Sequence, residues 1–349
     1  MNLLYLNHYA GAPALGMEFR PYYLAREWVR LGHRVQMVAC ATSHVRATAP
    51  TPRGRPVEQP EHQDIDGIDY LWFPGPPYQG NGLGRVKNIW AFLNQVWRAA
   101  PGIARHFRPD VVIASSTYPM DIWVAHRIVR LARQQGRPCK LVFEVHDLWP
   151  LSPIELGGMS PKHPFIRLCQ AAENYAYRHA DVVVSMLPKV ADHMQAHGLD
   201  LRKLHIVPNG ITLDEWDGAP EPLREDVAGA VAAARAAGRT VVGYAGSMGL
   251  PNALDTLLDA AKRLRDAGAA IAFVMVGGGH ERDRLAERVR TEGLEASVTM
   301  LAPIPKRQIP SFLAGIDIAY IGWQRVPIYR FGIAPNKLMD YMMARSEEH

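Results

Sequence analysis

The chain has 349 residues, a length at which two domains are the usual expectation. Its hydrophobic fraction of 48% and charged fraction of 21% exclude a disordered, collagen-like or coiled-coil protein. Three cysteines without a CxxC spacing argue against a disulfide scaffold or a structural zinc site. Neither a secretion signal nor a membrane span is expected. The formal net charge of +5 divides into +7 for residues 1–206 and −2 for residues 207–349, so the first half is suited to an anionic surface or ligand.

The first half alternates predicted strands and helices, which is typical of a parallel α/β sheet. Strands are expected at 3–9, 35–40, 111–116, 141–147, 182–186 and 204–210, and helices at 20–31, 88–107, 120–135, 163–179 and 188–197. Residues 48–63 are rich in proline and are expected to form an exposed loop.

The alternation stops near 207–216 and then begins again. An alanine-rich helix at 224–238 is followed by strands at 241–247, 270–279, 298–304 and 317–323, helices at 252–266, 280–290 and 306–314, and a last helix from about residue 335. We therefore expect two Rossmann-like domains, 1–206 and 207–349. Ligands are expected in a cleft between them, at the carboxyl ends of the strands.

The motif EVHDLWP at 144–150 follows a hydrophobic strand. It places His146 and Asp147 at the strand's carboxyl end, where α/β domains hold their active sites. Because imidazole changes protonation near neutral pH, His146 is a candidate for proton transfer or for stabilising developing charge. A purely structural histidine is the alternative.

A glycine-containing turn, GYAGSMG at 243–249, lies between a predicted strand and a predicted helix. Gly246, Ser247 and Gly249 would let backbone N–H groups approach a phosphate. The turn does not match GxGxxG and no acidic residue follows at the usual distance, which argues against an NAD oxidoreductase. The second glycine run, at 277–279, is expected to be a tight turn.

The segment FGIAPNKLMDYMMA at 331–344 begins a helix near Pro335. Asn336, Lys337 and Asp340 share one side of that helix. A lysine in the first turn is electrostatically unfavourable unless an anion is bound there. The segment is therefore a candidate anion site, and a solvated lysine at a frayed helix end is the alternative.

In this order, EVHDLWP, IVPNGI, GYAGSMG, VGGG and APNKLMDYMMA resemble the landmarks of the family-4 retaining glycosyltransferases of GT-B architecture. The resemblance extends from residue 1 to about 344. The first β/α unit is similar to that of a bacterial subgroup that builds O-antigen or capsule and includes N-acetyl-L-fucosamine transferases.

The resemblance implies roles for particular residues. It makes His146 an active-site residue close to the donor sugar and Asp340 the carboxylate that binds the nucleotide ribose. Residues 246–249 correspond to the diphosphate loop. The implied donor-binding set is Gly246, Ser247, Gly249, Gly332, Asn336, Lys337 and Asp340. Gly16, Glu18 and Arg20 are implied on the acceptor side. The resemblance implies no cofactor and no metal, and a UDP-linked donor.

The sequence also departs from the family pattern. Gly332 stands where a glutamate is common, and the basic residues that usually flank the diphosphate loop are absent, so Lys337 is our candidate for neutralising the diphosphate. Glu287 and Glu295 have the spacing of the family's glutamate pair but lie too early in the chain, and residues 64–66 are expected in a turn rather than in a metal-binding DxD. The second domain is expected to be incomplete.

Residues 85–108 combine basic and aromatic side chains, with Trp90, Leu93 and Trp97 on one helical stripe. The stripe either faces the core or docks on a membrane, with Arg85, Lys87, Arg98 and Arg105 near anionic headgroups. No nucleic-acid-binding module is recognisable.

We therefore expect a glycosyltransferase at the inner face of the cytoplasmic membrane. It would move an N-acetylated or deoxy amino sugar from a nucleoside diphosphate to a lipid-linked saccharide. The alternatives are a GT-B nucleotide-sugar 2-epimerase and an inactive relative that binds a nucleotide or a partner.

Overall fold

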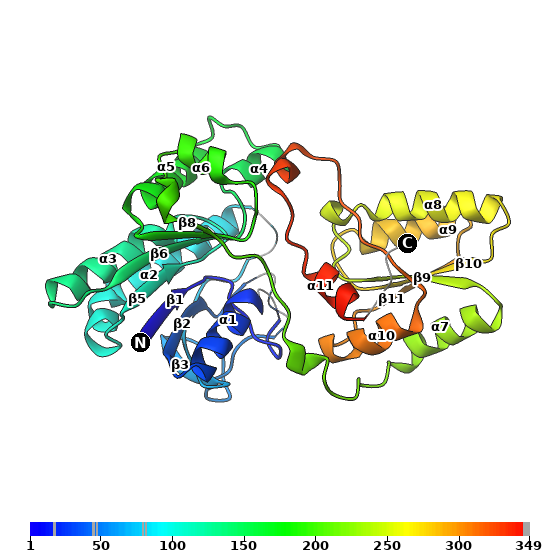
Figure 1. The fold of residues 1–349 in the computed structure, drawn as a ribbon, viewed down its shortest axis with the longest axis horizontal. Helices are drawn as coiled ribbons and strands as arrows, with labels where there is room; N and C mark the ends of the chain where they lie inside the picture. Colours follow the sequence, from blue (N-terminus) through cyan, green and yellow to red (C-terminus); the bar gives the residue numbers. More distant parts are fainter. Residues whose placement is uncertain (17–18, 44–45, 47, 79, 81, 345–349) are drawn as a thin grey trace. The chain divides into compact units, whose positions relative to one another are not determined.

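The computed structural model describes residues 1–16, 19–43, 46, 48–78, 80 and 82–344. These residues form two compact units, each built on its own sheet (Figure 1). Unit 1 comprises 1–208 and 326–334, and unit 2 comprises 209–325 and 335–344. The segment 326–334 therefore belongs to unit 1, whereas the sequence placed it in the second domain.

Unit 1 contains an eight-stranded sheet of order β3-β4-β2-β1-β5-β6-β7-β8. Its strands are β1 (Asn2–Leu6), β2 (Arg34–Cys40), β3 (Glu61–Ile65), β4 (Ile68–Phe73), β5 (Val111–Ala114), β6 (Lys140–Val145), β7 (Val182–Ser185) and β8 (Leu204–Ile206). Its helices are α1 (Phe19–Arg30), α2 (Leu83–His106), α3 (Asp121–Gln134), α4 (Leu151–Glu155), α5 (Pro164–His179) and α6 (Ala191–Ala196). All neighbouring strands are parallel except β3 and β4.

The period-2 alternation of β1 explains how the layers form. Leu4 and Leu6 pack in a core with α2, α3 and α5, whereas Leu3 and Tyr5 pack in a separate core with α1. The same alternation in β6 turns Phe143 and Val145 toward the first core. Glu144 is directed to the α1 side, where it contacts Tyr5.

The expectation of a loop throughout 48–63 is wrong for its last residues. β3 begins at Glu61 and pairs antiparallel with β4, with Asp66 and Gly67 in the turn that joins them. Asp64 and Ile65 thus belong to a strand. β3 lies at the edge of the sheet and exposes His62 and Asp64, and an edge strand tolerates such polar residues.

Unit 2 contains a parallel four-stranded sheet of order β11-β10-β9-β12. Its strands are β9 (Thr240–Ala245), β10 (Ile271–Val276), β11 (Val298–Leu301) and β12 (Ile318–Ala319). Its helices are α7 (Glu225–Ala236), α8 (Leu254–Asp266), α9 (Arg282–Thr291), α10 (Ile309–Gly315) and α11 (Asn336–Met343). Helices α8 and α9 cover one face of this sheet, and α7, α10 and α11 cover the other (Figure 1). Both units thus have the α/β architecture expected from the sequence.

Short 3-10 turns complete the elements. They are η1 (Leu201–Lys203), η2 (Leu213–Glu215), η3 (Leu250–Asn252), η4 (Lys306–Gln308) and η5 (Pro327–Phe331). Among the described residues, none of the helices has the length and apolar character that crossing a bilayer requires.

Candidate active site

The polar centre of unit 1 is built around the buried carboxylate of Glu144. One carboxylate oxygen accepts hydrogen bonds from the Tyr5 hydroxyl and from Ser115 Oγ, the latter at 2.7 Å. The Arg20 guanidinium lies 3.0 Å from the other oxygen. Burial by itself would raise the pKa of Glu144, but hydrogen bonding and charge from His146, and then the Arg20 charge, hold it well below its usual range. Glu144 is therefore ionised at neutral pH.

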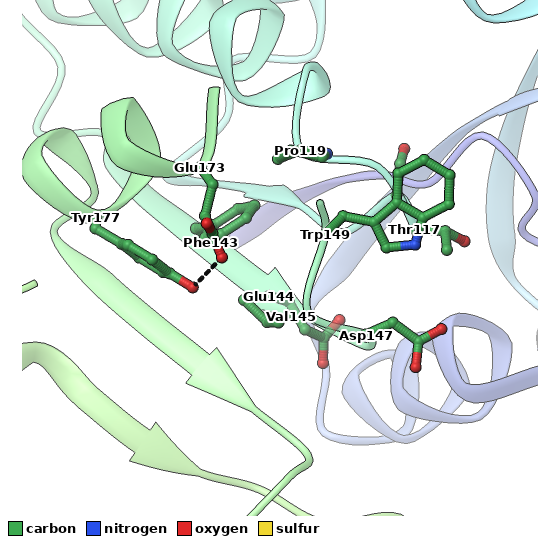
Figure 2. Close-up of a pocket in the computed structure, with 10 residues that line it drawn as sticks. Thr117, Pro119, Phe143, Glu144, Val145, Asp147, Trp149, Glu173 and Tyr177 are labelled. Carbon is green, nitrogen blue, oxygen red and sulfur yellow. Dashed lines mark hydrogen bonds between the residues drawn. The ribbon is translucent and has the colours of Figure 1, made fainter. Parts of the chain in front are cut away.

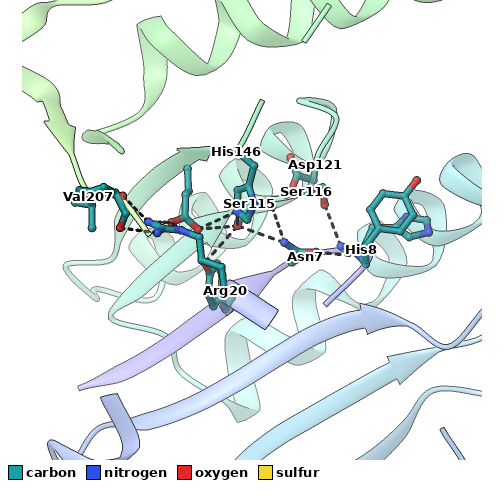
Figure 3. Close-up of polar contacts among 12 residues, drawn as sticks. Asn7, His8, Arg20, Ser115, Ser116, Asp121, His146 and Val207 are labelled. Carbon is teal, nitrogen blue, oxygen red and sulfur yellow. Dashed lines mark hydrogen bonds and ion pairs between the residues drawn. The ribbon is translucent and has the colours of Figure 1, made fainter. Parts of the chain in front are cut away.

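His146 follows β6 directly and lies on the same side of the strand as Glu144. Its Nε2 atom is 2.8 Å from Ser115 Oγ and 3.4 Å from a Glu144 oxygen, and 12% of its side chain is exposed (Figure 3). Asn7 fixes the Ser115 backbone by donating from Nδ2 to the Ser115 carbonyl at 2.7 Å. The histidine is thus held by strand-end residues from β1, β5 and β6, and the sequence motif placed it correctly at a carboxyl end.

A second buried carboxylate, Asp121, starts helix α3 near the same strand ends. It accepts a hydrogen bond from the Ser116 backbone N–H at 2.8 Å. Burial raises its pKa to about 7, against which the Ser116 hydrogen bonds act. Asp121 therefore titrates near neutral pH, whereas Glu144 does not.

The residues expected on the acceptor side have different environments. Arg20 donates to Glu144 and to the backbone carbonyls of Val207 and Pro208, at 2.8 and 2.9 Å respectively (Figure 3). Gly16 has a positive φ of 75° and closes a small turn with Ala12. Glu18 lies outside the described residues. In this structure Arg20 thus joins α1 to β6 and to Val207 and Pro208, at the end of the first segment of unit 1.

A small cavity opens beside this polar centre, with a volume of about 10 Å³, enough for about one water. Asp147, Trp149 and Glu173 contribute to its wall (Figure 2). Sequence reasoning singled out His146 but missed Glu144 and Ser115. The spacing of Glu144 and His146, two residues apart on one strand, is the pattern that could have identified the pair.

The donor-binding residues expected in unit 2 gather at the end of β9. Gly246 has a φ of 150°, and a Cβ added to it would lie 3.1 Å from the Lys337 Nζ atom. The exposed Ser247 offers its carbonyl to the Tyr244 hydroxyl at 2.6 Å and to Asn252 Nδ2 at 2.9 Å. The loop at the end of β9 and the start of α11 therefore meet.

Lys337 is half-buried against this loop. Its Nζ donates to Asn252 Oδ1 at 2.9 Å and lies 5.2 Å from the centre of the Tyr244 ring. Among the described residues no carboxylate pairs with it, and burial lowers its pKa. A desolvated ammonium without a counter-ion is unfavourable, so the position is suited to an anionic ligand.

The other expected donor-binding residues are dispersed. Asp340, one turn after Lys337 in α11, has its pKa raised by burial. Asn336 is exposed at the start of α11, and Gly249 is buried. Gly332 lies in unit 1 with a φ of 93°, and a Cβ there would be 2.6 Å from the Pro188 ring. The backbone at Gly332 thus accounts for glycine where the family often has glutamate.

Comparison with known proteins decides the family. Residues 16–210 match the family described as the glycosyl transferase 4-like domain, and residues 232–336 match glycosyl transferases group 1. The chain belongs to the glycosyltransferase 4-like family. This establishes the family-4 part of the resemblance, whereas the matches do not extend to the O-antigen or capsule subgroup.

Two curated relatives act on the same aminocyclitol. One is the 2-deoxystreptamine N-acetyl-D-glucosaminyltransferase of Streptomyces fradiae, 27% identical over 65% of this chain and 53% of its own length. The other is the 2-deoxystreptamine glucosyltransferase of Streptomyces kanamyceticus, 24% identical over 65% of this chain and 58% of its own. This glycosyltransferase 4-like chain thus aligns with little more than half of each relative.

Solved structures support the fold. Anabaena HepE in complex with UDP and glucose has a TM-score of 0.62 at 17% identity and covers 99% of this chain and 78% of its own. Sucrose-phosphate synthase from Thermosynechococcus elongatus has a TM-score of 0.63 at 16% identity, with coverage of 93% and 77%. Together with the family matches, these similarities confirm the expected α/β GT-B fold.

Proposed function

We propose that this chain is a glycosyltransferase that uses a UDP-linked sugar, with an N-acetylated or deoxy amino sugar as the group transferred. The ammonium of Lys337 beside Gly246, with which no carboxylate of the described residues pairs, carries this proposal. The UDP named in the HepE structures and the N-acetylglucosaminyl group named for the Streptomyces fradiae relative support it. Asp340, one turn further along α11, is the proposed ribose ligand.

In this proposal the reaction needs no metal ion. The leaving group is a nucleoside diphosphate, and its developing charge is stabilised by Lys337 and by backbone N–H groups of the loop at Gly246. His146, fixed by Ser115 and Glu144, acts near the sugar that is transferred. Retention of configuration follows from the family resemblance.

Lys337→Met is expected to weaken UDP binding by about 10- to 100-fold, the range for hydrogen bonds to charged groups. Uridine binding should change little, because the nucleoside lacks the diphosphate. The free protein should become slightly more stable, because a desolvated charge is removed. Isothermal titration with UDP and uridine measures both affinities.

Lys262→Met in α8 is the matched control. Lys262 is a surface lysine in unit 2 that pairs with Glu292 at 3.4 Å, and its loss should leave both affinities unchanged. Equal losses of UDP and uridine affinity in the Lys337 variant would contradict the assignment of the diphosphate charge to Lys337.

For the acceptor we propose a lipid-linked saccharide, reached by peripheral attachment of unit 1 to the inner face of the cytoplasmic membrane. An apolar groove of about 450 Å³ between α2 and α3 supports this proposal. Trp90 and Trp97 line it with 48% and 40% exposure, whereas Leu93 is buried. The tryptophans are therefore not core residues, and exposed indoles beside basic residues suit a membrane interface.

The four basic residues expected to contact headgroups differ in exposure. Lys87, Arg98 and Arg105 are exposed. Arg85 instead donates to the Tyr9 hydroxyl at 3.0 Å and stacks on Trp149. We therefore expect headgroup contact from the first three and not from Arg85.

Vesicle sedimentation tests this attachment. The protein should bind phosphatidylglycerol vesicles, lose binding as salt is raised, and bind phosphatidylcholine vesicles weakly, because the attraction is screened beyond about 8 Å at physiological ionic strength. Trp90→Ser combined with Trp97→Ser should abolish binding. Leu31→Ser, which changes an exposed apolar residue at the end of α1, should not. Equal binding of both variants to either vesicle would refute the groove as the contact.

A soluble aminocyclitol is the second candidate acceptor, favoured by the 2-deoxystreptamine named for both curated relatives. Sugar transfer to 2-deoxystreptamine in the absence of lipid would support it. Transfer only to a polyprenyl-linked saccharide in vesicles would support the first candidate.

A further inference from the structure

A group of potential metal ligands lies in unit 1, and one of its members, Glu173, also contributes to the wall of the small cavity beside the polar centre around Glu144. It consists of Glu173 in α5, His193 in α6 and His197 just after α6, helices that are neighbours in Figure 1. One ligand atom from each residue lies within 4.8 Å of the other two. Glu173 is buried and both histidines are half-buried. We propose that these three side chains bind a Zn²⁺ ion that joins α5 to α6.

The distance between His193 and Glu173 suits a shared ion better than a direct hydrogen bond. His193 Nε2 is 3.4 Å from Glu173 Oε1, which is long for a hydrogen bond. Two ligand atoms about 2.1 Å from a tetrahedral zinc ion are about 3.4 Å apart. The imidazole rings of His193 and His197 have centres 4.3 Å apart, and a nitrogen of each lies within 4.8 Å of the other and of a Glu173 oxygen.

The groups around Glu173 and His197 already orient these two side chains for a metal. His197 Nδ1 lies 2.8 Å from the His193 carbonyl oxygen. A proton on Nδ1 makes this contact and leaves Nε2 as the ligand atom, the arrangement usual for metal-bound histidine. Glu173 Oε1 accepts from the Tyr177 hydroxyl at 2.9 Å (Figure 2), and Oε2 accepts from Gln170 Nε2 at 2.6 Å.

The chemistry of the three side chains indicates which metal ion they would bind. Two imidazoles and one carboxylate suit zinc, whereas magnesium and calcium prefer oxygen ligands alone. Three protein ligands leave a fourth position for water. The site would stabilise unit 1, because α6 is close to the 326–334 segment: the Phe331 ring is 5.4 Å from the His193 ring, and the Lys189 N–H donates to the Phe331 carbonyl at 3.0 Å.

Untagged protein, freed of metal with a chelator and titrated with ZnCl₂, tests the proposal. We expect one ion per chain by isothermal titration, a higher Tm with zinc, and a visible absorption band when Co²⁺ replaces Zn²⁺. His193→Gln and His197→Gln should each weaken zinc binding by more than about 100-fold. Tyr177→Phe should weaken it by about 10- to 100-fold, the usual effect of losing a residue that orients a ligand.

His179→Gln is the matched control, because His179 is an exposed histidine at the end of the helix that carries Glu173. It should leave the zinc affinity and the zinc-dependent Tm rise unchanged. The Co²⁺ band and the conservative Tyr177→Phe variant keep the test decisive if a histidine variant folds poorly. Absence of stoichiometric zinc binding, or equal affinity in wild type, His193→Gln and His197→Gln, would overturn the proposal.

Discussion

His146→Ala is expected to lower kcat for sugar transfer by about 100- to 10,000-fold and to leave KM for the UDP-sugar nearly unchanged. The Ser115 hydroxyl and the Glu144 carboxylate hold its imidazole through Nε2. The ring is therefore oriented before substrate binds. An oriented group that interacts mainly with the transition state affects kcat, because substrate binding does not depend on it. Steady-state kinetics with UDP release as the readout separates the two parameters.

His126→Ala is the control for this experiment. His126 is a half-buried histidine in α3. Its ring lies 2.8 Å from the hydroxyl of Tyr175 in α5, whereas His146 follows strand β6. Its loss should leave kcat unchanged. A His146 variant with near-wild-type turnover, or one whose only defect is a higher donor KM, would remove the histidine from the catalytic step.

Glu144→Gln is expected to destabilise unit 1 by about 3–5 kcal/mol, because the change leaves the Arg20 charge without its buried partner. Only 10% of the Arg20 side chain and 5% of the Glu144 side chain are exposed, so water cannot replace the lost carboxylate. Glu27→Gln provides the comparison, since its pairing with Arg30 at 3.0 Å is about half exposed on both sides. That change should cost less than about 1 kcal/mol.

The Glu144 contribution should also depend on pH. Its pKa is lower in the folded protein than in the unfolded chain, so the stabilisation is complete above the ordinary glutamate pKa of about 4.3. It is lost as pH falls from there toward the folded value. Urea unfolding at pH 7, 5 and 4 should show a constant difference between wild type and Glu144→Gln at the first two values and a smaller one at pH 4. A difference that grows at low pH would contradict the ionised, paired carboxylate.

The sequence predicted most of the fold because local patterns specify it. Alternating strands and amphipathic helices gave parallel sheets, and the positions of β1, β6 and β9 followed from apolar runs that end in glycine or polar residues. β3 was missed because its exposed polar residues carry no hydrophobic pattern. The placement of 326–334 in unit 1 could not be predicted, because it depends on Ile328 and Phe331 packing in a core formed by residues far earlier in the chain.

In the candidate sites, too, residues marked by a local sequence pattern could be predicted, and residues defined by contacts with distant parts of the chain could not. His146 and Lys337 were identified because each follows a recognisable strand end or helix start. Glu144 was not, because a single glutamate within a strand does not reveal that Arg20 lies beside it. The zinc ligands were missed for a related reason: the cysteine count argues against a thiolate site but does not address Glu173, whose proximity to His193 arises only in the folded chain.

Unit 1 is built from two segments of the chain that are separated by most of unit 2, and this order has a consequence for folding during translation. Its residues up to Pro208 leave the ribosome first, but Ile328 and Phe331, which complete the same core, follow only after roughly 120 residues of unit 2. At about 5–20 residues per second, that interval lasts about 6–24 s. During translation, part of the apolar surface of unit 1 therefore stays exposed until residues 326–334 have been synthesised. A fragment that stops at Pro208 would keep that surface uncovered permanently and would be prone to aggregate.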